Sequence, residues 1–221
     1  MIALREQQPR FTPAEYLAWE EQQEIRYEYV DGEVYAMTGG TINHSKIAAN
    51  FITILKNHLR GSGSQILTSD AKVQTLAANS YSYPDVSVTC DERDRNASES
   101  ISHPCLIIEI LSPSTEAYDR GNKFRRYRRS TSLQEYVLVS TTEMCLEVYQ
   151  PTERGRWELT TYTDGELVEF KSVNLSVSID QIYEDIIFAP EDLSSNWYPP
   201  PNPQTWGLGG IYPREQAILA P

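Results

Sequence analysis

Two acidic residues interrupt segments that otherwise have the composition of buried β-strands. Glu109 lies within LIIEIL at 106–111, and Asp85 lies within YPDVSV at 83–88. The nearly continuous apolar run at 105–111 predicts a strand at the centre of a sheet whose two faces are both covered. An ionised carboxylate in such a strand is costly unless another charge or hydrogen bonds compensate for it. The fold must therefore bury this strand and also provide a partner for Glu109.

A bound metal ion is one partner that could compensate both carboxylates. Alternation along a strand places Glu109 on the same face as Ile107 and Leu111. If the strand of Asp85 is its neighbour, both carboxylates point into one cleft. With a main-chain carbonyl, most simply that of Ile110, they would provide half of the octahedron that Mg²⁺ prefers. Such an ion could activate water and neutralise charge on a phosphodiester. The alternative is that Asp85 caps a turn and Glu109 pairs with an arginine.

The remaining patterns alternate between helix and strand. Helices are expected from Thr12, as N-cap, to about Gln23, from 41–43 to Gly61, over 118–129 and over 179–188. One or two strands are expected at 64–76, and single strands at 85–90, 105–111 and 135–140. A hairpin is expected around the Asp-Gly pair at 31–32, and an antiparallel set at 146–149, 157–162, 167–170 and 173–175. This order predicts an α/β fold with a mixed central β-sheet flanked by helices and extra antiparallel strands.

The 221-residue chain is expected to form one domain over residues 1–189. Residues 190–221 contain a cluster of prolines with little periodicity, which predicts an extended C-terminal tail or partner-binding arm. Three widely spaced cysteines, Cys90, Cys105 and Cys145, predict buried small side chains and not a disulfide framework or a zinc site. No apolar leader or membrane-length run is present, which predicts a cytoplasmic protein that does not enter a membrane.

The charge of the chain is acidic, with 19 Lys plus Arg against 31 Asp plus Glu, so that the net charge is 19 − 31 = −12. This balance counts against a dedicated high-affinity DNA-binding module, because contacts to phosphate supply most of the non-specific binding energy. It is compatible with a nuclease that has a local basic surface and uses carboxylates to hold metal ions.

Several motifs taken together resemble one family. They are YEYVDGE at 27–33, His44 at the start of the long helix, YPDV at 83–86, EILSPST at 109–115, Asp119 with Lys123, and LQEY at 133–136. Over about residues 12–188 the chain resembles the Uma-type family of restriction endonucleases, within the PD-(D/E)XK nuclease superfamily. The resemblance implies a restriction-endonuclease-like fold, with Asp85 and Glu109 as ligands of Mg²⁺ or Mn²⁺.

The lysine of the superfamily motif is absent from its usual position, two residues after the acid, where this chain has Leu111. We expect Lys123 to replace it in space, because Asp119, Lys123 and Arg126 recur on one face of the following helix. Lys72 is the second candidate. The alternative for Lys123 is an exposed pair with Asp119, worth only ~0.3–0.5 kcal/mol.

Two further candidates come from the family pattern. A first-helix acid adds to the metal shell in related nucleases, so Glu28 and His44 are considered, with Glu33 beside the hairpin turn. The alternative for His44 is a helix cap or a contact with a buried carbonyl, and Glu33 could simply be exposed on the hairpin.

The segment KFRRYRR at 123–129 is the densest basic run. It could follow a phosphate backbone, with Tyr127 available to stack on a base. The alternative is a solvated helix face with Phe124 and Tyr127 in the core, which leaves Arg125 and Arg129 as the exposed pair.

The sequence therefore predicts a Mg²⁺-dependent endonuclease that hydrolyses phosphodiester bonds of DNA, with RNA as a substrate that the same chemistry would serve. The alternative is a catalytically inactive member of the fold that acts as a binding or assembly module. The resemblance implies a homodimer. No helix-turn-helix or zinc module that would read bases is present in the sequence.

Overall fold

The structure is a computed structural model that describes residues 10–37 and 39–188. The proline-rich tail predicted at 190–221 lies outside the described residues, so it stays a prediction. In the described part, the predicted α/β class is confirmed, because a mixed sheet lies between helices and further antiparallel strands accompany it. None of the helices in these residues is long and apolar enough to cross a bilayer.

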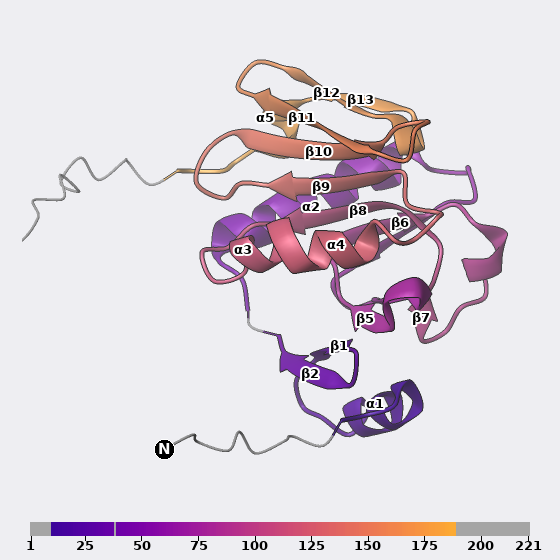
Figure 1. The fold of residues 1–221 in the computed structure, drawn as a ribbon. Helices are drawn as coiled ribbons and strands as arrows, with labels where there is room; N and C mark the ends of the chain where they lie inside the picture. Colours follow the sequence, from indigo (N-terminus) through magenta and orange to yellow (C-terminus); the bar gives the residue numbers. More distant parts are fainter. Residues whose placement is uncertain (1–9, 38, 189–221) are drawn as a thin grey trace, which may run out of the picture. The chain divides into compact units, whose positions relative to one another are not determined.

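A six-stranded sheet contains the two strands of greatest interest (Figure 1). Its order is β11-β10-β9-β8-β6-β3. The strands are β3 (Gln65–Thr68), β6 (Val86–Thr89), β8 (Pro104–Ile110), β9 (Glu135–Val139), β10 (Cys145–Pro151) and β11 (Trp157–Thr163). Strand β8 pairs parallel with β9 and antiparallel with β6. Every residue of β8 is buried, as the apolar run predicts for a central strand.

Two smaller sheets complete the β-structure of the described residues. One has the order β2-β1-β5-β4-β7, and the other is the hairpin β12-β13. The strands are β1 (Tyr27–Val30), β2 (Glu33–Ala36), β4 (Lys72–Thr75), β5 (Ser80–Ser82), β7 (Ser100–Ile101), β12 (Leu167–Phe170) and β13 (Leu175–Ser178). The predicted β1-β2 hairpin turns at Asp31 and Gly32, which both have positive φ, as a tight hairpin turn requires.

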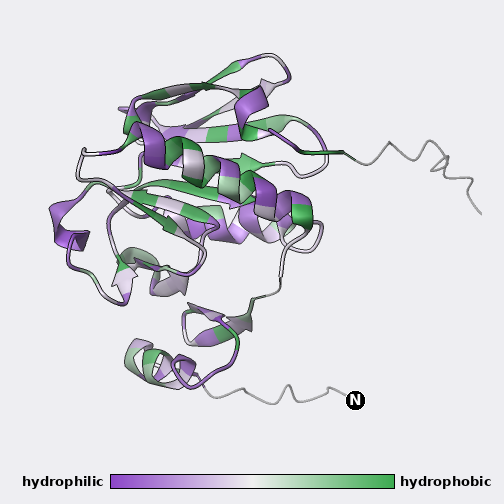
Figure 2. Ribbon diagram, turned by 180° about the vertical axis from the view of Figure 1, so that it is seen from behind, coloured by the Kyte–Doolittle hydropathy of each residue, from purple (hydrophilic) through white to green (hydrophobic). Residues whose placement is uncertain are grey.

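Helices cover both faces of the six-stranded sheet. Helix α2 (Ile42–His58) runs across one face, behind the strands in Figure 1 and in front of them in Figure 2. On the other face lie α3 (Glu116–Tyr118), a π-helical turn (Asp119–Lys123) and α4 (Phe124–Tyr127). The short helices α1 (Pro13–Glu20) and α5 (Ile179–Ile182) complete the set of α-helices in the described residues.

Alternation along β8 divides the core into two halves. Leu106, Ile108 and Ile110 pack with the apolar side of α2, in a cluster that also includes the β12-β13 hairpin. Ile107 and Leu111 face the other way, toward a cluster that includes Tyr127 and Tyr136. Glu109 therefore points to the α3–α4 side of the sheet, on the face predicted from strand alternation.

The structure differs from the sequence predictions in several elements. Helix α1 ends at Glu20 and α5 at Ile182, earlier than expected, and the predicted helix over 118–129 is three short segments. The region 64–76, where one or two strands are expected, forms two strands that belong to two different sheets. The strand expected at 173–175 begins later, because Val173 ends a 3₁₀ turn and β13 starts at Leu175. Cys105 is buried as predicted, but Cys90 is exposed and Cys145 is half-buried.

A buried carboxylate fixes the connection between β6 and β8. Asp94 accepts hydrogen bonds from the backbone amides of Ser102 and His103, at 3.0 and 2.8 Å, and from the Thr89 hydroxyl at 2.9 Å. Burial alone would raise the pKa of Asp94, but these hydrogen bonds and the contact with the His103 ring outweigh it and lower the pKa. The ionised form is therefore the one that the native state stabilises.

Replacing Asp94 with Asn should destabilise the fold by about 1–3 kcal/mol at pH 7, because an NH₂ group replaces one of the two oxygens that accept hydrogen bonds from buried donors. Since the folded pKa of Asp94 is lowered, its contribution is present above the unfolded pKa of about 4 and is lost as the pH falls toward the folded value. Urea unfolding between pH 7 and pH 3 should therefore show a difference between wild type and variant that shrinks with acid. Exposed Glu158→Gln serves as the control, and an equal difference at all pH values would contradict this account.

Candidate active site

Strand pairing brings Asp85 and Glu109 together. The antiparallel register pairs Val86 with Ile108, so Asp85, which immediately precedes β6, lies beside Glu109 on β8. The Oδ2 atom of Asp85 accepts a hydrogen bond from the amide of Ile110 at 2.7 Å. Glu109 is buried, whereas Asp85 is partly accessible. The structure therefore meets the condition set in the sequence analysis, that the strands of Asp85 and Glu109 are neighbours.

Lys123 is the cation that contacts Glu109. Its Nζ atom lies 2.9 Å from Oε1 of Glu109, 3.2 Å from Oε1 of Glu28 and 3.7 Å from Oδ1 of Asp119. Lys123 and Asp119 are both buried, so the alternative of an exposed surface pair is wrong. The lysine that lies next to Glu109 therefore comes from the helical segment that follows β8.

The segment that carries Lys123 is a π-helical turn. Residues Asp119–Lys123 interrupt what the sequence pattern predicts as one regular helix. The backbone carbonyl of Asp119 accepts a hydrogen bond from the buried Tyr136 hydroxyl at 2.9 Å, which ties the turn to β9. Single π turns inside helices are frequent at functional sites. Here both Asp119 and Lys123, at the two ends of the turn, are buried.

Burial shifts the pKa values of Glu109, Asp119 and Lys123. Burial raises the pKa of Glu109 well above its usual value, and the Lys123 ammonium opposes that shift. Burial raises the pKa of Asp119 in the same way. For Lys123, burial disfavours the charge, but Glu109, Glu28 and Asp119 outweigh it and raise the pKa well above the usual range. Lys123 is therefore charged, and its charge opposes the protonation of Glu109 that burial favours.

Glu28 contacts Lys123, and hydrogen bonds hold both of its carboxylate oxygens in place. Its Oε1 also accepts the amide of Tyr83 at 3.2 Å, and its Oε2 accepts the hydroxyl of Tyr118 at 3.1 Å. The Arg126 guanidinium in turn donates to the Tyr118 hydroxyl and lies 4.9 Å from the centre of its ring. Tyr118 is a residue of the site that was not predicted, since it belongs to no predicted motif and only its position next to Asp119 links it to the site.

His44 lies in the first turn of α2 and faces Asp85. Its Nε2 is 3.2 Å from Oδ2 of Asp85, and this hydrogen bond raises the pKa of His44 against the effect of burial. The alternative in which His44 caps the helix is wrong, because the Thr41 side chain is the N-cap acceptor.

Lys72 and Glu33 lie elsewhere. Lys72 forms an ion pair with the buried Glu20 at 2.7 Å, and Glu20 also accepts the Tyr83 hydroxyl. Glu33 is exposed on the hairpin and accepts the Tyr35 hydroxyl at 2.6 Å. Of the two lysines considered from the sequence, only Lys123 is paired with Glu109 in the structure.

The basic run divides into core and surface positions. Tyr127 is buried, and Phe124 stacks on Tyr136 with ring centroids 5.1 Å apart, so Tyr127 is not available to stack on a base. Arg125 and Arg129 are exposed, as predicted. Both therefore lie where a polyanion could reach them.

Comparisons with known proteins agree with this arrangement. A family model described as "Uma2: Putative restriction endonuclease" matches residues 13–180, which is most of the chain. The chain belongs to the Uma2 family. The family resemblance stated from its motifs is thereby confirmed.

Two proteins of Synechocystis sp., both described as uncharacterized, resemble this Uma2 protein. One is 47% identical over 180 residues, which are 81% of this chain and 95% of the relative. The other is 34% identical over 151 residues, which are 67% of this chain and 85% of the relative. The crystal structure of a putative nuclease belonging to DUF820 from Anabaena variabilis has a TM-score of 0.66, covers 80% of this chain and 99% of its own, and is 19% identical. That likeness supports the fold.

The donors of the Uma2 site suit a hard divalent cation. Carboxylate oxygens are the ligands that Mg²⁺ and Mn²⁺ favour. Glu28, Glu109 and Asp119 surround Lys123, and Asp85 lies next to Glu109 on the neighbouring strand. Apart from its ion pair with Lys123, the buried Oε1 of Glu109 has no hydrogen-bond partner within the described residues. Donor chemistry and charge thus fit a metal held by Asp85 and Glu109.

The carboxylates of the described residues are not arranged around one ion position. The described residues contain no group of three acidic, histidine or cysteine side chains placed as a metal shell. Glu28 and Asp119 are instead turned toward Lys123. The Ile110 carbonyl ligand expected from the sequence stays a prediction.

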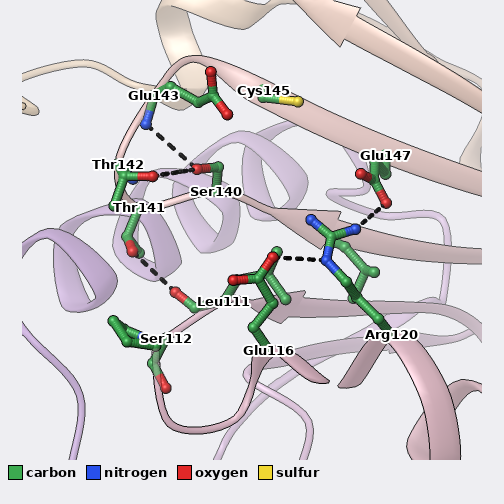
Figure 3. A pocket seen from close by; sticks show the side chains of 12 residues that line it. Leu111, Ser112, Glu116, Arg120, Ser140, Thr141, Thr142, Glu143, Cys145 and Glu147 are labelled. Atoms are coloured by element: carbon green, nitrogen blue, oxygen red, sulfur yellow. Dashed lines mark hydrogen bonds and ion pairs between the residues drawn. The ribbon is translucent and has the colours of Figure 1, made fainter. Parts of the chain in front are cut away.

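A separate cavity of about 140 Å³ lies at the carboxyl ends of β8 and β9, with Leu111 and Ser140 in its lining (Figure 3). Arg120 points into this cavity, but its guanidinium is held by Glu116 at 2.7 Å and by Glu147. Because that cation is already neutralised, it is not available to a phosphate. Neither Glu109 nor Lys123 lines the cavity, so it is distinct from the carboxylate group.

Replacing Lys123 with Met should leave a buried carboxylate without its partner and cost ~3–5 kcal/mol at pH 8. Without the ammonium, the folded pKa of Glu109 rises further, so the folded variant retains a proton that the unfolded chain releases above about pH 4.3. Stability of the variant should therefore fall as the pH rises from 5 to 8, measured by urea unfolding in EDTA.

The matched control is the double variant Lys123→Met with Glu109→Gln, which has no carboxylate at position 109 to titrate. It should lack the additional pH dependence. A double variant with the same slope as Lys123→Met would show that Glu109 is not the group responsible.

Proposed function

We propose that this Uma2 protein is a metal-dependent endonuclease that hydrolyses phosphodiester bonds of DNA, with Asp85, Glu109 and Lys123 at its centre. The observation that carries the proposal is the 2.9 Å pair between Glu109 and Lys123 beside Asp85. Together with Asp85, this pair would supply the two carboxylates and the lysine of the superfamily, with the lysine on a helical turn instead of the strand.

Each of the three side chains has a distinct part in the proposal. Glu109 and Asp85 are the residues that would hold Mg²⁺ or Mn²⁺, and such an ion supplies charge neutralisation at phosphate and a more acidic bound water. Lys123 holds a positive charge next to Glu109, where it would stabilise negative charge that develops on the phosphate. Glu28 holds the lysine in place, and Tyr118 in turn donates to Glu28.

Membership of a nuclease family supports a nucleic acid as the substrate class. The choice of DNA over RNA, the homodimer and the cytoplasmic location are predictions carried from the sequence. The sequence contains no helix-turn-helix or zinc module that would read bases. We therefore propose cleavage without a recognition sequence.

Nicking of supercoiled plasmid in Mg²⁺ or Mn²⁺ tests the proposal. Wild-type protein should nick the plasmid, and Glu109→Gln and Asp85→Asn should abolish the activity. Lys123→Ala should lower the rate on the order of 10²–10³-fold, the usual loss for one charge-stabilising donor. Lys72→Ala is the matched lysine control and should retain activity, since Lys72 pairs with Glu20.

Two outcomes would contradict the proposal. Loss of activity in Lys72→Ala together with full activity in Lys123→Ala would show that Lys72, and not Lys123, is the lysine of the site. Absence of cleavage, together with no rise in melting temperature on addition of Mg²⁺ or Mn²⁺, would favour an inactive nuclease fold that binds or assembles.

Replacing Arg125 and Arg129 with alanine should weaken DNA binding and reduce the slope of log affinity against log salt by about 1 for each phosphate that is no longer neutralised. Fluorescence anisotropy of a labelled duplex at several salt concentrations, in EDTA to prevent cleavage, measures both quantities. The exposed pair Arg154 and Arg156, also replaced with alanine, is the control of equal charge. Equal salt slopes for the wild type and the Arg125 and Arg129 variant would exclude this surface.

A further inference from the structure

Two of the three cysteines lie in contact although they are 15 residues apart. The Sγ atoms of Cys90 and Cys105 are 3.3 Å apart, and both residues carry free thiols. Cys90 directly follows β6, and Cys105 is the second residue of β8, so the contact spans two hydrogen-bonded strands. The strand pair therefore holds the thiols close together without a covalent link.

The two thiols differ in access. Cys90 is exposed, whereas Cys105 is buried. The Ser64 hydroxyl donates to the Cys90 sulfur at 3.1 Å, and the Cys105 thiol donates to the Val88 carbonyl at 3.3 Å. Because the Cys105 proton points to Val88, the sulfur lone pairs are free to face Cys90. This is the arrangement of an accessible thiol with a protected resolving thiol behind it.

We infer that Cys90 and Cys105 form a redox modification site, in which a peroxide oxidises the pair to an intramolecular disulfide that thiol reductants reverse. The inference is independent of nuclease activity. It rests on the Sγ–Sγ contact, on the exposure of Cys90 and on the burial of Cys105.

The reaction consumes one peroxide in two steps, oxidation of Cys90 and then condensation with Cys105. The Cys90 thiolate attacks one peroxide oxygen, the O–O bond breaks, and the departing hydroxide takes up a proton to leave as water. Cys90 is then a sulfenic acid. The Cys105 sulfur attacks the Cys90 sulfur, the S–S bond forms, and the S–O bond breaks with loss of hydroxide, which leaves as water with the Cys105 proton. Two thiols are oxidised and one peroxide is reduced to two waters.

Formation of the bond requires only a local movement. The sulfur atoms must approach from contact distance to a bond length of about 2.05 Å. Since Cys90 lies just beyond the end of β6, its side chain and backbone can adjust without breaking the pairing of Val86 with Ile108. The disulfide would fasten this end of the β6-β8 pair, opposite the end that carries Asp85.

Treatment of the reduced full-length protein with hydrogen peroxide tests the inference. Maleimide labelling of the unfolded chain should fall from three free thiols to one, the intact mass should decrease by two hydrogens, and non-reducing peptide mapping should find Cys90 linked to Cys105. Dithiothreitol should restore all three thiols.

Two single variants make the test specific. Cys90→Ser changes an exposed residue, and it should abolish the link and leave Cys105 reduced. Cys145→Ser should form the link as the wild type does, since Cys145 is outside the pair. Three free thiols after peroxide, Cys90 recovered as sulfinic acid beside reduced Cys105, or a link that involves Cys145 or a second chain would each overturn the inference.

Discussion

The burial of Lys123 among carboxylates is the interaction on which the site depends. A buried lysine without negative neighbours would lose its proton, and the buried carboxylates without the lysine would gain one. The charged state of the lysine therefore depends on the carboxylates, and that of the carboxylates depends on the lysine. The partners come from separate elements, since Glu28 is on β1 of the small sheet, Glu109 is on β8 of the large sheet and Asp119 is in the π-helical turn. The ionic group thus also joins these elements.

The acidic composition of the chain overstates the negative charge at its surface. Glu135, which is fully buried, accepts the amides of Lys171 and Ser172 at 2.8 and 2.9 Å and fixes the segment before β13. Asp94 likewise accepts a backbone amide, that of His103, in the connection between β6 and β8. Glu20 is paired with Lys72. Several carboxylates are thus used inside the fold, which lessens the conflict between a net charge of −12 and a polyanionic substrate.

The sequence could predict the parts of the site that depend on local pattern. The apolar run identified β8 as a central strand, alternation gave the face of Glu109, and the spacing of Asp119 and Lys123 predicted that they share a side of one segment. The π-helical turn at Asp119–Lys123 was not predicted, because a single turn with π-type hydrogen bonds does not change the spacing of apolar residues enough to be recognised in the sequence. The position of Glu28 beside Lys123 also could not be derived, since it depends on how β1 pairs with β5 and how that sheet packs.

Moving the lysine tests the central claim most directly, namely that Lys123 replaces in space the lysine absent at position 111. The measurement is the metal-dependent nicking rate of Lys123→Leu with and without Leu111→Lys, with folding checked by circular dichroism. Because position 111 shares a strand face with Glu109, the account predicts that Lys123→Leu is strongly impaired and that adding Leu111→Lys recovers activity. Nicking by Lys123→Leu at the wild-type rate, or a folded double variant with no recovery, would contradict it.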